Sequence, residues 1–320
     1  MFDPADPSAE YELAWPRELF VAEAMALPEP SSPTWFEDAE LLLEEAFILN
    51  APKDDLRTTK WYELPPGLLK DPPSASPKKV ARAIVAHLVN SAEELPERSE
   101  RRPYWSVRST DRAISTPPAA QDWIQQLQRE WAQLVDDLQD RGYMDWVAPQ
   151  GCDARPASPP AVEVLAAEIE RRLRVDGLWP LRYEDWDSDT FYGLIEVVHD
   201  LVARPRHRDQ HDFDGCSGHY SNFAPTPGQV LYRWDVNQLL DRYGAGLRIA
   251  AQGEDRGRLV HPADDGREEL LQRILQSPDP DVRDDAEHAI ALFRSRTVTT
   301  AERRSAVVAL AGVLERRGRC

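Results

Sequence analysis

Apolar residues recur at helical spacing in the first half of the chain, and this pattern predicts amphipathic helices. In residues 34–49, Trp35 and Leu42 belong to a stripe that follows one helical face. The clearest stripe lies in residues 119–142, and Gly142 follows it at the position where a left-handed residue commonly ends a helix. The stretches with a helical pattern in this half are 34–49, 77–91 and 119–142.

The second half continues the helical pattern and adds one segment with strand-like runs. Helices are predicted over residues 159–175, 187–205, 227–244, 267–277, 281–296 and 300–318. Residues 247–251 and 258–260 flank a glycine-bounded turn and predict a β-hairpin. The expected fold class is therefore mostly α, with an irregular helical N-terminal half and a helical C-terminal half that contains one small β-hairpin.

Residues 148–160, APQGCDARPASPP, separate these halves. Proline and small residues dominate the segment, as is typical of a linker between domains. We therefore expect two domains. The first, 1–150, is an acidic helical region that contains many of the Trp and Pro residues, and the second, 151–320, is helical with the hairpin near 247–260.

Composition narrows the function classes. The formal net charge of −18 repels phosphate backbones, so we expect no nucleic-acid binding by this chain alone. No apolar run approaches the roughly 20 residues that cross a bilayer, and the acidic, Pro-containing start is unlike a secretory leader. The three cysteines form no C-x-x-C pair, which favours reduced thiols. We expect a cytoplasmic protein that does not bind membranes.

Residues 204–220, RPRHRDQHDFDGCSGHY, gather potential metal ligands in a predicted loop. If these residues converge, the candidate metal ligands are His211, Asp214, Cys216 and His219, with His199 on the preceding helix. These residue types suit zinc. The spacing matches no established zinc motif. The favoured interpretation is a polar loop held by hydrogen bonds from its own side chains, so no metal or other cofactor is expected.

A second candidate for chemistry is RDDAEH, in which Arg283 and His288 have the spacing of the HEPN ribonuclease motif. In that motif the two side chains stabilise and protonate phosphate oxygens during RNA cleavage. Here the residues fall within a predicted helix, where an offset of five residues places them about 140° apart around the axis. Chance occurrence is the favoured interpretation, and we expect no RNA cleavage by the chain alone.

The chain from residue 176 onward resembles a known family. The segments GLWPL, FYGLIEVVHDLVARPR, GCSGHY, LYRWDVNQLLDRYGAGLRIA, GRLV and EHAIALFRSR together resemble the central region of bacterial AbiJ-like, HEPN-associated abortive-infection proteins. The matching positions are the helix with Glu196, His199 and Asp200 and the loop with Cys216 and His219. The resemblance implies antiviral defence and a further C-terminal domain with the ribonuclease-like motif, which this chain is expected to lack.

Two function classes follow from these expectations. The first is a non-catalytic sensor or interaction module of an antiviral system, which controls a protein effector by contact. The alternative is an enzyme, either a metal-dependent hydrolase that uses the 199–219 cluster or a divergent HEPN-type ribonuclease that uses Arg283 and His288.

The last predicted helix is the expected interface. Its apolar surface includes Ala306, Leu310, Val313 and Leu314, and small residues beside them let a partner helix approach closely. An uncovered apolar surface on an acidic protein commonly marks an association site. We expect residues 301–317 to mediate self-association or docking to an effector, and Leu310→Glu to weaken that association.

Overall fold

The computed structural model describes residues 11–60, 77–98, 122–151, 159–181, 186–209 and 218–261, and beyond them 276, 279, 280, 283–288, 304 and 308. The chain divides into two compact units, Met1–Tyr243 and Gly244–Cys320. The expected boundary at 148–160 therefore lies inside the first unit. The physical reason is that α6, which precedes this segment, packs against α9, which follows it.

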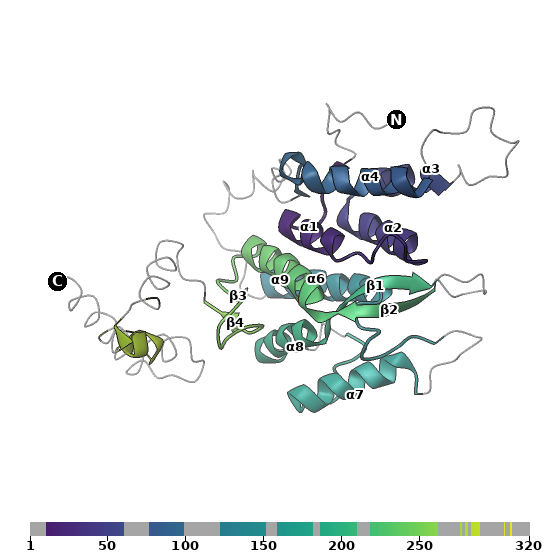
Figure 1. The fold of residues 1–320 in the computed structure, drawn as a ribbon. Coiled ribbons are helices and arrows are strands. Elements are labelled where there is room, and N and C mark those ends of the chain that lie inside the picture. Colours follow the sequence, from purple (N-terminus) through teal and green to yellow (C-terminus); the bar gives the residue numbers. More distant parts are fainter. Residues whose placement is uncertain are drawn as a thin grey trace, which may run out of the picture. The chain divides into compact units, whose positions relative to one another are not determined.

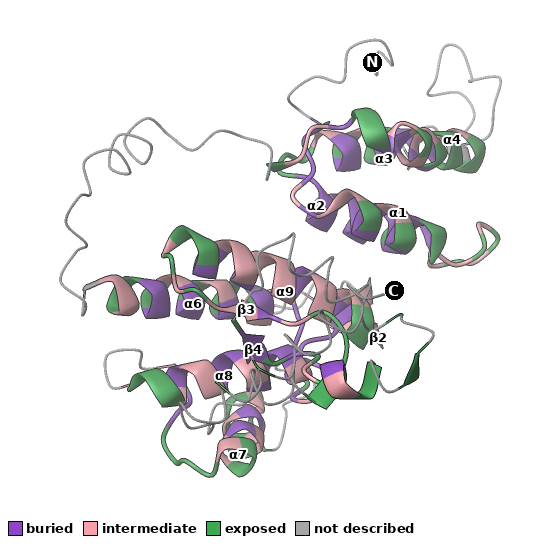
Figure 2. Ribbon diagram, turned by 90° about the vertical axis from the view of Figure 1, so that its left-hand side faces the viewer, coloured by how far each residue is buried: buried purple, intermediate pink, exposed green. Residues whose placement is uncertain are grey.

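The first unit is a stack of helices with one pair of strands (Figure 1). Helices α3 and α4 cover α1 and α2, which in turn contact β1 and α9, while α8 packs under α9 and α7 under α8. Burial follows this layering, since the helices of the stack turn buried faces toward one another (Figure 2). The elements are α1 (Arg17–Met25), α2 (Trp35–Ala46), α3 (Ala51–Lys60), α4 (Pro77–Asn90), a 3-10 turn (Ala92–Glu94), α6 (Asp122–Asp140), α7 (Ala161–Leu173), α8 (Ser188–Leu201), β1 (Arg204–Asp209), β2 (His219–Ala224) and α9 (Pro225–Arg242).

The mostly α fold class expected from the sequence is confirmed. The apolar stripes at 34–49, 77–91 and 119–142 form α2, α4 and α6. Gly142 follows α6 with a φ of +77°, and the ring of Tyr220 packs where a Cβ would lie. This close approach and the positive φ together explain why glycine ends the helix. None of the helices in the described ranges is long and apolar enough to cross a membrane.

The second unit contains the expected small hairpin. Strand β3 (Arg248–Ile249) pairs antiparallel with β4 (Leu259–Val260), as the strand-like runs at 247–251 and 258–260 predict. Further along, residues 283–288 are helical, which agrees with the helix expected over 281–296.

An additional pair of strands forms where the sequence indicated a polar loop. Strand β1 pairs antiparallel with β2, from Arg204 opposite Ala224 to Asp209 opposite His219. The favoured interpretation of 204–220 as a loop held by its own side chains is therefore wrong for 204–209. This segment is a strand whose polar side chains bind distant helices.

The first of these contacts is a buried ion cluster centred on Arg204. Its guanidinium Nη1 donates to Glu23 Oε2 on α1 at 2.7 Å, and its Nε donates to Glu45 Oε2 on α2 at 3.1 Å. The three side chains are only 2–4% exposed. Arg206 donates to both oxygens of Glu23, and the Arg204 guanidinium stacks 4.9 Å from the centre of the Trp15 ring. The cluster joins β1 to both N-terminal helices.

Two further pairs continue this contact along β1. Arg208 forms a two-pronged contact with Glu44 on α2, with its Nη2 2.9 Å from Glu44 Oε2, and Lys53 approaches the same carboxylate. His207 Nδ1 lies 2.7 Å from Asp38 Oδ1. Each arginine of the strand, and His207, therefore has an acidic partner on α1 or α2.

Candidate functional site

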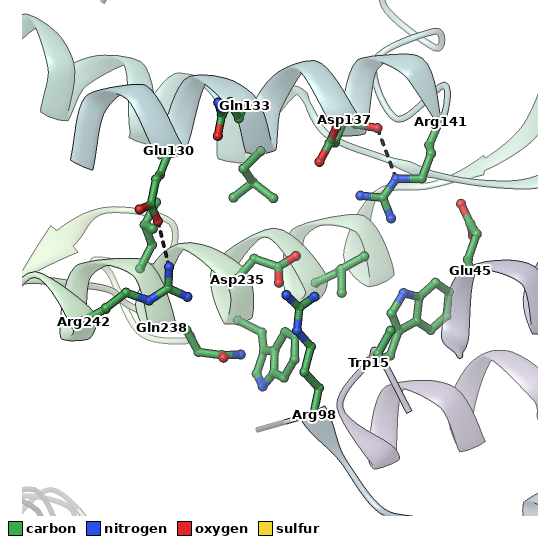
Figure 3. Close-up of a pocket in the computed structure, with 15 residues that line it drawn as sticks. Trp15, Glu45, Arg98, Glu130, Gln133, Asp137, Arg141, Asp235, Gln238 and Arg242 are labelled. Carbon is green, nitrogen blue, oxygen red and sulfur yellow. Dashed lines mark hydrogen bonds and ion pairs between the residues drawn. The ribbon is translucent and has the colours of Figure 1, made fainter. Parts of the chain in front are cut away.

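The candidate site is a polar cavity of about 390 Å³ in the first unit. Its walls come from α6, from α9 and from N-terminal segments that include Trp15, Glu45 and Arg98 (Figure 3). The volume falls within the range of small-molecule pockets in proteins. Charged and amide side chains dominate its lining, so the cavity suits a polar ligand.

Helix α6 supplies the first wall. Glu130, Gln133, Asp137 and Arg141 occupy positions i, i+3, i+7 and i+11, and this spacing places them along one face of the helix. Trp131 lies on another face and is fully buried. The buried tryptophan fixes the rotation of α6, and that rotation turns the polar face toward the cavity.

Helix α9 supplies the second wall in the same way. Asp235, Gln238 and Arg242 follow one face at positions i, i+3 and i+7. Tyr232, one turn before Asp235, is fully buried and accepts a hydrogen bond from Trp131 Nε1 at 2.8 Å. Because this buried bond joins the two helices, their polar faces are held on either side of the cavity.

An ion pair closes one end between these walls. Arg242 Nη1 donates to Glu130 Oε2 at 2.7 Å, and the hydroxyl of Tyr243 donates to Glu130 Oε1 at 2.6 Å. Both oxygens of this carboxylate are therefore engaged within the protein. The groups that remain for a ligand lie further along the cavity.

The third wall is positioned by a short extended segment around Leu13. Leu13 N donates to Pro96 O at 2.8 Å, and Arg98 N donates to Leu13 O at 2.9 Å. These bonds align the segment that contains Trp15 with the segment that ends at Arg98. Both side chains are thereby presented to the cavity.

Two arginines flank one carboxylate in this cavity. Arg98 and Arg141 come from different walls; Arg98 lies beside Asp235 (Figure 3), and the charges of both arginines act on this carboxylate. Burial raises the pKa of Asp235 to about 6, and the two guanidinium groups oppose that rise. Burial also raises the pKa of Glu45, against the charges of Arg204 and Arg141.

Several buried polar atoms at this site have no partner. Six such side-chain atoms occur among the described residues, and three of them belong to residues that line the cavity. These three are Trp15 Nε1, Glu45 Oε1 and Gln238 Nε2. Buried polar groups in proteins nearly always have partners, and each orphan costs about 1–3 kcal/mol. Because these atoms have almost no accessible surface, a ligand in the cavity would supply partners only after small shifts of the side chains around them.

We expect Asp235→Asn to stabilise the protein above pH 6. The pKa of Asp235 is about 6 in the folded state and 3.8 as a model value, so stability falls as the pH rises from about 4 to about 6. Asparagine removes this cost even though Arg98 and Arg141 lose a charged neighbour. The expected gain is about 1–2 kcal/mol at pH 7.5, since solvent still reaches part of the side chain, and none below pH 4.

Asp145→Asn is the matched comparison for this prediction, and it should show the same effect. Burial also raises the pKa of Asp145 to about 6, but this residue does not line the cavity. Chemical denaturation at pH 4, 5.5 and 7.5 should show the same pH trend for both variants. A gain from Asp235→Asn that is equal at pH 4 and pH 7.5 would contradict the role of its charge.

The sequence candidates for a metal site are placed differently. His199 on α8 is 2% exposed, and both of its ring nitrogens have partners. Its Nε2 lies 3.2 Å from Arg233 Nη1, and its Nδ1 lies 3.1 Å from Asp200 Oδ1. Since arginine can only donate, Nε2 accepts and Nδ1 carries the hydrogen. The ring therefore bridges two side chains of the protein.

Three of the remaining metal candidates, His211, Asp214 and Cys216, lie outside the described residues, and His219 is in β2. Within the described ranges, no group of three or more His, Cys, Asp or Glu could hold a metal ion. We still predict that the purified protein carries no stoichiometric zinc, and elemental analysis is the test.

The other candidates lie in the second unit. Arg283 and His288 lie in one helical segment, as the sequence predicted, and both are exposed. The interface candidates Ala306, Leu310, Val313 and Leu314 lie outside the described residues. The expected interface therefore stays a prediction.

The cavity residues were not among the sequence candidates. Their only trace in the sequence is a repeat of mixed charges and amides at helical spacing in α6 and in α9. This pattern is typical of a solvated helix face, so it does not indicate a site by itself.

Comparisons with family models, with curated proteins and with solved structures find no match to this chain. What the cavity binds is therefore inferred from the residues that line it.

Proposed function

We propose that the protein is a non-catalytic sensor module that binds a small polar ligand in the cavity between α6 and α9. The observation that carries this proposal is a polar cavity of about 390 Å³ whose lining includes three residues with an unpartnered buried atom, at Trp15 Nε1, Glu45 Oε1 and Gln238 Nε2. Leaving such groups unsatisfied lowers stability, and that cost is typical of binding sites whose polar groups are arranged for a ligand.

The kinds of side chain in the cavity favour binding over covalent catalysis. Guanidinium, carboxylate, amide and indole groups line it, and all of these hold ligands by charge and hydrogen bonding. The described lining residues include no Ser, Thr, Cys, Lys or His, so carboxylates such as Asp235 are the groups there that could carry a proton or act as a nucleophile. Recognition is therefore the role to which the lining is best suited.

Glu45 supports a sensing role because it belongs both to the ion cluster around Arg204 and to the cavity lining. Its Oε2 accepts from Arg204 in the ion cluster, while its Oε1 is unpartnered and the residue lines the cavity. A ligand that binds Oε1 would change the charge balance around Arg204 and hence the attachment of β1. Such a change could be transmitted to a protein effector.

The biological setting of this proposal comes from the resemblance to AbiJ-like abortive-infection proteins. In that setting the ligand would signal phage infection, and the output would be contact with an effector. The cavity supplies the ligand site that a sensor of this kind needs.

We expect a tryptophan at position 133 to block ligand binding. Gln133 is an exposed residue of the cavity wall, so Gln133→Trp fills space without removing a buried group. Gln125→Trp is the control, since Gln125 is exposed on the same helix but does not line the cavity. Each purified protein is dialysed against small-molecule extracts of bacteria taken before and after phage infection, and retained compounds are identified by mass spectrometry.

The expected result is a compound that the wild type and Gln125→Trp retain and Gln133→Trp does not. Retention from the infected extract alone would support the antiviral setting, whereas equal retention from both extracts would refute it. If no compound depends on an open cavity, the sensor proposal fails.

A further inference from the structure

Two of the three unpartnered atoms in residues that line the cavity are hydrogen-bond donors. Trp15 Nε1 and Gln238 Nε2 are unpartnered donors, while Glu45 Oε1 is a single unpartnered acceptor. Trp15 is only 1% exposed, so water cannot readily reach its N–H from outside the cavity. This excess of donors favours a ligand that is rich in acceptors.

The two arginines add further donors at the same place. Arg141 uses its Nε on the main-chain oxygen of Asp137 at 3.1 Å, and this bond points its terminal nitrogens into the cavity (Figure 3). Arg98 enters from the other side, and its guanidinium lies beside Asp235. Two guanidinium groups carry ten N–H donors, more than one carboxylate can accept.

The acidic groups of the lining engage only part of these donors. Glu130 is engaged by Arg242 and Tyr243, and Glu45 Oε2 is engaged by Arg204. Asp137 is exposed to solvent at the cavity rim. Within the described lining, Asp235 is the carboxylate on which the charges of both arginines act, and it cannot accept from all of their N–H groups.

We propose that the ligand carries an oxyanion, either a phosphate or a carboxylate, that binds between Arg98 and Arg141, together with a hydrogen-bond donor that reaches Glu45 Oε1. Oxyanions bind guanidinium groups through paired, charge-assisted hydrogen bonds. This inference rests on the proposed sensor function and specifies the chemistry of its ligand.

Titration calorimetry of the full chain with defined probes tests this inference. The probes are inorganic phosphate, adenosine monophosphate and glutamate, with spermidine as a cationic comparison at matched ionic strength. Arg98→Gln and Arg141→Gln should each weaken binding of the oxyanion probe about tenfold or more. Arg171→Gln is the control, because Arg171 is exposed on α7 and pairs only with nearby Glu168.

The probes also separate the two sources of the oxyanion. Binding of phosphate or adenosine monophosphate alone indicates a phosphate ligand, and binding of glutamate alone indicates a carboxylate. Oxyanion binding that is as strong in both cavity variants as in Arg171→Gln overturns the inference, and so does binding of spermidine in preference to the anions.

The compound retained in the dialysis experiment shows whether the oxyanion inference fails alone or the proposed sensor function fails with it. A neutral or cationic compound whose retention requires an open cavity would overturn the oxyanion while leaving the sensor function intact. If nothing is retained and none of the probes binds, both proposals fail together. Arg98 is exposed, so Arg98→Gln should leave the fold intact, and a thermal melt of the variant checks this.

Discussion

Arg204→Met should lower the free energy of unfolding by about 3–5 kcal/mol at pH 7. The substitution keeps the aliphatic volume but removes the cation that faces Glu23 and Glu45, whose side chains are 2% and 4% exposed. Glu23 retains Arg206, but Glu45 loses the only hydrogen bond described for its side chain. An unpaired buried carboxylate is among the most destabilising features in a protein interior.

Two variants test whether this loss reflects the buried charge. Arg171→Met removes an exposed arginine from a surface pair on α7 and should leave stability unchanged within error. Adding Glu45→Gln to Arg204→Met should restore part of the stability, because the orphaned charge is then removed as well. Urea denaturation measures each free energy. A loss below about 1 kcal/mol for Arg204→Met would show that the ion cluster does not hold β1 in place.

Gly228→Ala should destabilise the protein by about 2 kcal/mol, although alanine is the better helix former. Gly228 lies in the first turn of α9, where a Cβ would approach Arg204 N to 2.6 Å and Ala203 Cα to 2.8 Å. Both atoms belong to the main chain that leads into β1, so neither can move without shifting the strand. Because glycine has no side chain, α9 and β1 can pack in contact at this position.

Gly193→Ala is the matched control on α8. A Cβ at Gly193 would meet the end of the Leu173 side chain at 2.9 Å, and that flexible end can turn away. Its free energy of unfolding should change by less than about 1 kcal/mol, because the gain in helix propensity offsets a small repacking cost. Thermal melts of both variants provide the measurement. A Gly228→Ala protein as stable as Gly193→Ala would mean that α9 can move away from β1.

The helices could be predicted from the sequence because their cause is local. In α6 and α8, apolar residues recur at helical spacing, and any chain with this pattern buries one face of a helix. Gly142 marks the end of α6 through its own backbone freedom. The hairpin at β3 and β4 was predicted for the same reason, since its turn and strands are adjacent in sequence.

The strand β1 depends on residues far away in the chain. Its sequence, RPRHRD, has no alternation of apolar and polar residues, so nothing in it indicates a strand. Its partners Glu23, Glu44 and Glu45 lie about 160 to 180 positions earlier. Only the tertiary structure, which brings α1 and α2 against this segment, pairs these charges and removes them from water.

The candidate site was likewise decided by the tertiary structure. The sequence alone determined that α6 is a helix with one apolar and one polar face and that residues 227–244 are helical, and a polar face is normally turned to solvent. Packing of Trp131 against Tyr232 instead turns both polar faces toward each other, and the pairing of Leu13 adds Trp15 and Arg98. A cavity is defined by groups that converge in space, and spacing along one helix carries no information about what lies opposite it.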